Sequence, residues 1–218
     1  MFHVEHRAEW WDVIVSGASG FGLSIDERVL SKLSVYLREL KNWNRKINLS
    51  GFEDPEQVAV KHFLDSFAGA LVLKDQPIGR MLDVGTGAGF PGLPLKIAFP
   101  RLPLRLLEPN AKKTAFLRHL IGTLGLDDVT VSSKRVQELA GNILEREKFT
   151  TVVTRAVAPS EILASAAAVL SEKGHIILWR TESLKLNQLP SGLILETELP
   201  YNLPQGYGVR RLSVLIRY

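Results

Sequence analysis

The chain has 218 residues, 45% hydrophobic and 23% charged, which is the balance of an ordinary globular protein and excludes a disordered or fibrous one. It contains no cysteine, which excludes disulfides, zinc–thiolate and iron–sulfur sites and a cysteine nucleophile. The formal charge of +4 is uneven: residues 1–77 hold 9 basic and 11 acidic side chains (net −2), and residues 78–218 hold 18 and 12 (net +6), a balance compatible with a polyanionic partner or a solvated surface.

The first 23 residues are predicted to form a loosely ordered arm. They include the Gly/Ser-rich stretch SGASGFG at 16–22. The charged start of the chain does not resemble a secretory signal, and no apolar run approaches the roughly 18 residues that span a membrane. We therefore expect a cytoplasmic protein.

Two helices are predicted after this arm. The sequence SIDE at 24–27 has the form of a capping box and precedes leucines at helical spacing, which predicts a helix over 25–44. Asp54-Pro55 provides an N-cap and a proline at the first helical position, and it begins a second helix that extends to about residue 73. Residues 1–77 are thus expected to form a helical N-terminal region.

Residues 78–218 alternate between strand and helix patterns. Strands are expected at 80–84, 102–107, 129–131, 151–154, 175–179, 193–199 and 209–216, and helices at 93–99, 111–124, 135–139 and 159–170. This alternation predicts an α/β fold with a mostly parallel sheet and helices on both faces. The last two strands have no helix between them, so they should form an antiparallel hairpin at one edge.

The segment that follows the first of these strands is rich in glycine. It reads DVGTGAG at 83–89, and glycines allow positive φ and close approach of a ligand to the backbone. Glu108 ends the next strand, where a carboxylate can accept hydrogen bonds from both hydroxyls of a ribose. A glycine-rich turn without a ligand is the alternative interpretation.

Two ligands compete for this loop. The sequence GAGFPG at 87–92 matches the dinucleotide pattern G-x-G-x-x-G, which makes NAD a candidate. However, the strand already ends at Gly85, and Pro91 lacks one of the helix N–H groups that would face a pyrophosphate. The pattern D-x-G-x-G-x-G instead resembles motif I of class I S-adenosylmethionine-dependent methyltransferases. Their cofactor has no phosphate, and Asp83 is placed to meet its ammonium group directly or through water.

The residues also restrict the methyl acceptor. Methylation at C5 of a pyrimidine needs a cysteine nucleophile, which is missing. The N/D-P-P-F/Y motif of exocyclic-amine methylation is absent after the fourth strand, where 154–158 read TRAVA. A ring nitrogen such as guanine N7 needs no general base, only proximity and orientation. Arg155 could hold the cofactor carboxylate, guanine O6 or a phosphate, or it could form a structural ion pair. The histidines show no metal-ligand spacing, so no metal is expected.

The sequence LDVGTGAGFPGLPL at 82–95 resembles the signature of the RsmG/GidB family, the bacterial small-subunit ribosomal RNA guanine-N7 methyltransferases. The other segments that resemble the family are WN at 43–44, NLS at 48–50, HFLDS at 62–66, KKTAFL at 112–117, RV at 135–136, TRA at 154–156 and RRL at 210–212. The resemblance covers about residues 25–218. It implies a Rossmann-like class I methyltransferase fold over 78–218 and methyl transfer from S-adenosyl-L-methionine to N7 of a guanine in 16S ribosomal RNA (527 in the family's usual rRNA numbering).

The resemblance also implies roles for matching positions. With Asp83 and Glu108, the expected cofactor-binding residues are Gly85, Gly87, Gly89, Phe90, Val136, Gln137 and Arg155. The expected RNA-facing or interdomain residues are Lys46, Asn48, His62, Asp65, Ser66, Arg180 and Arg210. Asn48 and Ser66 could instead be helix caps. Arg180 stands where the family usually has a lysine, Gln137 replaces a glutamate, and Glu108-Pro109-Asn110 replaces the commoner D-S turn.

We therefore predict a monomeric, metal-free methyltransferase whose partner is 16S ribosomal RNA or the small ribosomal subunit. Two alternatives remain open at this point. One is an NAD(P)-dependent oxidoreductase that uses the same glycine loop. The other is a non-catalytic RNA-binding factor on a methyltransferase fold.

Overall fold

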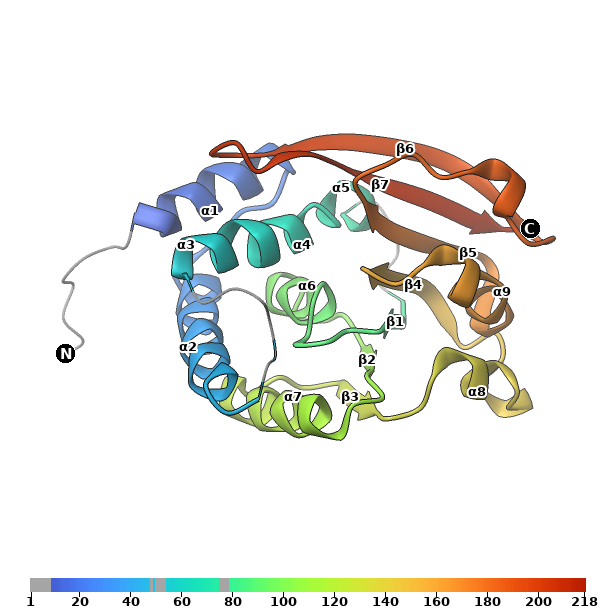
Figure 1. Ribbon diagram of the computed structural model, residues 1–218, viewed down its shortest axis with the longest axis horizontal. Coiled ribbons are helices and arrows are strands. Elements are labelled where there is room, and N and C mark those ends of the chain that lie inside the picture. Colours follow the sequence, from blue (N-terminus) through green and yellow to red (C-terminus); the bar gives the residue numbers. More distant parts are fainter. Residues whose placement is uncertain (1–8, 48, 50–53, 75–78) are drawn as a thin grey trace.

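The computed structural model describes residues 9–47, 49, 54–74 and 79–218, and it contains one seven-stranded sheet (Figure 1). The strands are β1 (Met81–Val84), β2 (Leu104–Leu107), β3 (Val129–Ser132), β4 (Phe149–Arg155), β5 (Leu170–Arg180), β6 (Leu193–Leu203) and β7 (Gly208–Arg217). They lie in the order β3-β2-β1-β4-β5-β7-β6. The first five are parallel, and β7 is antiparallel to both β5 and β6. The α/β fold, with its mostly parallel sheet and its terminal hairpin, is confirmed.

Helices cover both faces of the sheet because neighbouring strand residues point to opposite sides. They are α6 (Gly92–Ala98), α7 (Ala111–Leu124), α8 (Val136–Ala140) and α9 (Pro159–Val169), with short 3-10 turns η2 (Ile143–Glu145) and η3 (Leu186–Gln188). In β4, Val153 packs in the hydrophobic cluster that contains α6 and α7, whereas Val152 packs in the cluster that contains α8 and α9. Both side chains are fully buried.

The helices before the sheet pack against one of these two faces. They are α1 (Glu9–Gly20), α2 (Glu27–Asn44), α3 (Pro55–Val58), the π-helical segment η1 (Ala59–Leu64), α4 (Asp65–Phe67) and α5 (Ala70–Leu73). Their apolar side chains share a single hydrophobic cluster with α6 and α7. The predicted boundary near residue 77 falls among 75–78, outside the described residues.

The predicted loose arm is wrong for residues 9–20, which form α1. Ile14 and Ala18 on this helix are fully buried. Gly17 faces η1 so closely that an added Cβ would lie 2.5 Å from Leu64 Cδ2. The small residues of the Gly/Ser-rich stretch therefore let α1 pack against another helix.

The two helix starts expected after α1 are nearly correct. The N-cap of α2 is Asp26, whose side chain accepts a hydrogen bond from Val29 N, so the helix begins two residues later than the SIDE pattern predicts. Asp54 caps α3 through Gln57 N, as expected. None of the helices in the described part of the chain combines the length and the hydrophobicity that a membrane span requires.

Candidate functional site

The strand order reverses between β1 and β4, since the chain proceeds from β1 to β2 and β3 on one side and from β4 to β5 on the other. In open α/β sheets, ligands bind outside the carboxyl ends of the strands at such a switch point. The loop after β1 is the glycine loop, and the loop after β4 begins with Arg155. The two candidate motifs thus lie on neighbouring strands at the same edge.

The glycine loop is shaped by its own carboxylate. Asp83 Oδ2 accepts hydrogen bonds from Thr86 Oγ1 at 2.6 Å and from Gly92 N at 2.8 Å. Gly85 has φ +69°, and an added Cβ there would lie 2.6 Å from Val157 Cγ2. Glycine at this position therefore permits both the left-handed backbone and the close approach of the loops after β1 and β4.

The second carboxylate oxygen of Asp83, Oδ1, is buried without a hydrogen-bond partner among the described residues. Burial raises the pKa of this carboxyl to about 6, against the lowering effect of the hydrogen bonds from Thr86 and Gly92. A hydrogen-bonded cation, such as an ammonium group, would strongly stabilise the ionised form of a buried carboxylate of this kind.

Glu108 lies across the glycine loop from Asp83. It is 7% exposed, and its Oε2 accepts a hydrogen bond from Gly87 N at 2.9 Å while its Oε1 accepts from Asn110 N at 2.9 Å. The carboxylate is therefore fixed at the end of β2, beside the loop. An added Cβ on Gly87 would meet nothing within 4 Å, so this part of the loop faces open space.

The turn expected to flank an adenine lies at the start of α8. Val136 is buried at 2% exposure and packs in the cluster beneath α8 and α9. Gln137 is exposed, and its Nε2 donates to Glu161 O at 2.7 Å. The Gln137 side chain thus links α8 to α9.

Phe90 lies in an aromatic cluster next to the glycine loop. Its side chain is 4% exposed, with His62 stacked on it at 4.5 Å between ring centroids and Tyr36 at 5.2 Å. Tyr36 Oη also donates to Ala88 O at 2.6 Å. With its ring enclosed in this way, Phe90 fastens the glycine loop to α2 and η1.

Arg155 is the centre of a second cluster. Its Nη1 donates to Lys61 O and to Asp65 Oδ2, both at 2.9 Å, and its Nη2 lies 2.8 Å from His62 Nδ1. Its guanidinium also lies 5.3 Å from the centroid of the Phe90 ring. Burial and the positive charges of Arg155 and Lys61 lower the pKa of His62 to about 3, so the imidazole is neutral at neutral pH.

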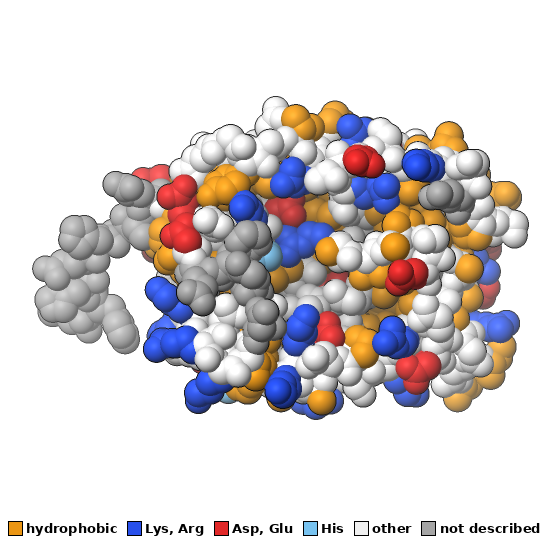
Figure 2. Space-filling view, viewed as in Figure 1, with side chains coloured by type: hydrophobic (Ala, Val, Ile, Leu, Met, Phe, Trp, Pro, Cys, Tyr) orange, Lys and Arg blue, Asp and Glu red, His pale blue; other side chains and the backbone are white. Residues whose placement is uncertain are grey.

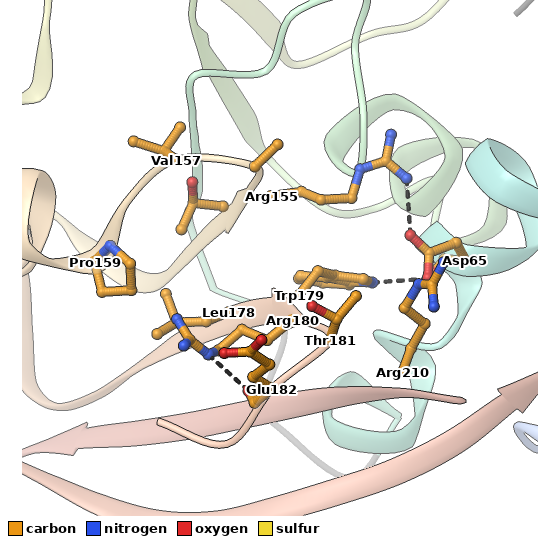
Figure 3. Close-up of a pocket in the computed structure, with 12 residues that line it drawn as sticks. Asp65, Arg155, Val157, Pro159, Leu178, Trp179, Arg180, Thr181, Glu182 and Arg210 are labelled. Carbon is orange, nitrogen blue, oxygen red and sulfur yellow. Dashed lines mark hydrogen bonds and ion pairs between the residues drawn. The ribbon is translucent and has the colours of Figure 1, made fainter. Parts of the chain in front are cut away.

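A pocket of about 350 Å³ opens beside this cluster at the carboxyl ends of β4 and β5 (Figure 3). This is within the size range of small-molecule sites. Arg155, Arg180 and Arg210 line it together with Asp65 and Glu182. Arg180 Nε donates to Glu182 O at 3.0 Å, and Arg210 Nη1 donates to Val209 O at 3.0 Å.

Figure 2 shows further Lys and Arg side chains spread over one face of the molecule, with basic side chains and a histidine near its middle.

The remaining predicted RNA-facing residues are dispersed. Lys46 is exposed just after α2, and Asn48 lies outside the described residues. Ser66 is fully buried, and its Oγ donates to His62 O at 2.5 Å. Direct contact between Ser66 and RNA is therefore excluded in this conformation, which leaves it a packing role between the helices and the sheet. In the part of the chain that is described, no group of three or more acidic or histidine side chains could hold a metal ion.

Sequence reasoning missed two residues that hold Asp65. Trp179 Nε1 donates to Asp65 O at 2.7 Å, and Tyr201 Oη donates to Asp65 Oδ1 at 2.6 Å. Both come from strands more than 100 positions later in the chain, and no local pattern marks them. Tyr36 was detectable, because it continues the buried stripe of α2 formed by Leu33 and Leu40.

The sheet order, the glycine loop and the carboxylate at the end of β2 define a Rossmann-like methyltransferase fold. Solved structures agree on the fold: TrmN from Thermus thermophilus superposes with a TM-score of 0.59 at 18% identity over 73% of this chain and 53% of that one. MtNAS in complex with MTA and tNA gives a TM-score of 0.60 at 12% identity over 86% and 73%.

Sequence comparison identifies the family within this class. The family described as rRNA small subunit methyltransferase G (GidB) matches residues 29–206. Ribosomal RNA small subunit methyltransferase G of Acetivibrio thermocellus is 37% identical over 94% of this chain and 88% of its own length, and that of Cellvibrio japonicus is 40% identical over 76% and 74%. The relative from Roseiflexus sp. is 42% identical over 70% of this chain and 65% of its own length. The chain belongs to the rRNA small subunit methyltransferase G family, which does not favour the oxidoreductase alternative.

Proposed function

We propose that this protein transfers the methyl group of S-adenosylmethionine to N7 of a guanine in 16S ribosomal RNA. The observation that carries the proposal is the position of the two clusters at one switch point. The carboxylates of the glycine loop lie on one side of the loop after β4, and the arginine-lined pocket lies on the other. Membership of the family supplies the reaction class and the RNA.

The residues around the glycine loop fit the cofactor. Asp83 Oδ1 is a buried acceptor without a partner among the described residues, which suits the ammonium of the amino-acid end. Glu108 at the end of β2 suits the ribose hydroxyls. When bound, S-adenosylmethionine supplies an electrophilic methyl group on a sulfonium. The chain's part is to hold and orient this group next to the loop after β4.

The arginines that line the pocket support a guanine as the acceptor. Guanidinium groups donate well to guanine O6 and to phosphate, and Arg155 and Arg210 contribute such groups to the lining. Guanine N7 carries its own lone pair and loses no proton on methylation, so no general base is required. Catalysis then rests on proximity and in-line orientation. Asp65, the carboxylate within reach of Arg155, acts as a partner of that arginine rather than as a base.

A methyl-transfer assay tests the proposal. The protein would be incubated with labelled S-adenosylmethionine and either small ribosomal subunits or free 16S RNA from a strain that lacks the endogenous enzyme. Cleavage at N7-methylguanine then maps the product. We expect label at a single guanine, and none with Arg155→Ala.

The contrary result is label on neither substrate, or label on another atom of the RNA. The melting temperature of the protein, measured with S-adenosylhomocysteine and with NAD, distinguishes the two cofactors. A ligand that binds only the folded state raises the melting temperature of the protein. Stabilisation by S-adenosylhomocysteine without methylated RNA would leave the cofactor assignment in place and overturn the acceptor.

A further inference from the structure

The carboxylate of Asp65 is held from two sides. It is 5% exposed, its Oδ2 accepts the hydrogen bond from Arg155 Nη1 at 2.9 Å, and its Oδ1 accepts the one from Tyr201 Oη at 2.6 Å. Each oxygen therefore has its own donor, and the two donors approach from different strands. The plane of the carboxylate, and with it the direction in which it holds Arg155, depends on both contacts.

Tyr201 is itself immobilised. Its side chain is 7% exposed, and Phe21 packs edge-on against its ring at 5.6 Å between centroids. Burial and the neighbouring Asp65 raise the pKa of Tyr201 far above its ordinary value, so the hydroxyl remains a donor throughout the working pH range. A short O–H···carboxylate bond between two buried groups is a strong orienting contact.

The same tyrosine is also linked to the arginine on the opposite side of the pocket. In the β6–β7 ladder, Tyr201 pairs directly with Arg210, which lines the pocket together with Arg155 and Asp65. The hydroxyl thus connects the hairpin that carries Arg210 to the carboxylate that holds Arg155. Trp179 completes the arrangement by donating to the backbone oxygen of Asp65.

We propose that Tyr201 is a positioning residue for methyl transfer, which acts through Asp65 to hold Arg155 in the acceptor pocket. Tyr201 does not line the pocket, so it does not need to touch the RNA base. Loss of its hydroxyl would leave Asp65 Oδ1 buried without that donor, and the carboxylate would be free to turn away from Arg155. The inference rests on the proposed function, whereas the restraint of Arg155 by Tyr201 and Asp65 can be measured without it.

Tyr201→Phe is the direct test, because it keeps the ring against Phe21 and removes only the hydroxyl. We expect kcat/KM for the RNA substrate to fall by about tenfold, because a small misplacement of a positioning group can cost up to about 10²-fold. The Kd for S-adenosylhomocysteine should stay at its wild-type value. The melting temperature should fall by only a few degrees, because one buried acceptor loses a donor while the ring packing remains. Tyr218→Phe, which removes an exposed hydroxyl at the other end of the hairpin, is the matched control and should change nothing.

Two further measurements distinguish positioning from packing. The guanidinium N–H resonances of Arg155 are assigned by their absence in Arg155→Lys. In the wild type they should be sharp and separate, because the guanidinium is held in place. In Tyr201→Phe they should average. In a double-mutant cycle, Tyr201→Phe should cost little once Asp65→Asn has removed the charge, because the two residues act on the same arginine.

Wild-type kinetics together with an unchanged Arg155 spectrum in Tyr201→Phe would overturn the proposal. A parallel loss of melting temperature, cofactor affinity and activity would overturn it as well, because that pattern is expected of packing alone. If the wild type methylates no RNA, the spectra still decide whether Tyr201 restrains Arg155, independently of the proposed function.

Discussion

The glycine loop and the Arg155 cluster lie at the ends of neighbouring strands, yet they are held in opposite ways. The carboxylate of Asp83 binds groups 3 and 9 positions away, whereas Arg155 binds Asp65 across 90 positions and Tyr201 binds Asp65 across 136. The turn of the loop is set by its own carboxylate, although Tyr36 and Glu108 also hold it. The cluster exists only after the N-terminal helices, the sheet and the terminal hairpin have packed together, so it can report on the integrity of all three.

Arg155→Ala should have the largest effect, because it removes the centre of the long-range cluster. We expect methyl transfer to fall about 10²–10³-fold, the usual result of removing one preorganised donor. Arg155→Lys should be intermediate, since it keeps the charge and loses the planar fork. The affinity for S-adenosylhomocysteine, measured by calorimetry, should change far less, because Arg155 lines the pocket, whereas the cofactor is expected at Asp83 and Glu108 beside the glycine loop. An equal loss of affinity and activity would place Arg155 in the cofactor site instead.

The contributions of the two regions to the unfolding free energy should also change with pH in opposite directions. The larger of the two changes is expected from His62. Its pKa is about 3 in the folded chain and 6.5 as an ordinary histidine, so the unfolded chain binds the proton first as pH falls. The stability that His62 confers is complete above pH 6.5 and decreases toward pH 3. Between pH 7 and pH 5 this amounts to about 2 kcal/mol of unfolding free energy.

His62→Phe tests this, because a phenyl ring can retain the stacking on Phe90 while the titrating group is removed. Urea unfolding at pH 7 and pH 5 would be compared for the two proteins. We expect the wild type to lose about 2 kcal/mol more than the variant over this interval. The same loss of unfolding free energy in both proteins would show that His62 does not cause the pH dependence.

Asp83 should produce a smaller effect of opposite sign. Burial raises its pKa from 3.8 to about 6, so the folded chain binds the proton more tightly and its contribution to stability is lost as pH rises through 6. From pH 5 to pH 8 the loss is on the order of 1 kcal/mol. Asp83→Asn should abolish this dependence and raise the melting temperature at pH 8, while binding of S-adenosylhomocysteine weakens at least about tenfold. A variant that is less stable than the wild type at pH 8 would refute this account.

The difference between the two regions also explains what sequence reasoning could reach. The positions of the sheet strands and of α2, α6, α7 and α9 were predicted because local patterns encode them, and the glycine loop was found for the same reason. The helix α1 was missed because glycines were interpreted as flexibility, although Gly17 serves close packing against Leu64. The partners of Asp65 could not be predicted, since Tyr201 and Trp179 reach it only through tertiary structure.

The smallest effect is expected outside both regions, at Lys46. This side chain is exposed after α2, and no described contact assigns it to the glycine loop or to the pocket. If it contacts an RNA phosphate, Lys46→Ala should weaken RNA binding by a few-fold and reduce the slope of log K against log salt by about 0.7–0.9. Binding of S-adenosylhomocysteine should remain unchanged.

Lys148→Ala is the matched control for Lys46→Ala. Lys148 is exposed just before β4 begins, and since β4 ends at Arg155, it lies at the opposite edge of the sheet from the pocket. Filter binding to 16S RNA across a salt series should therefore show the wild-type slope for Lys148→Ala and a shallower one for Lys46→Ala. Equal slopes in both variants would mean that the RNA senses only the overall charge of the molecule. An equal loss of RNA and cofactor binding in Lys46→Ala would instead connect the end of α2 to the glycine loop, and the two regions would no longer be separable by mutation.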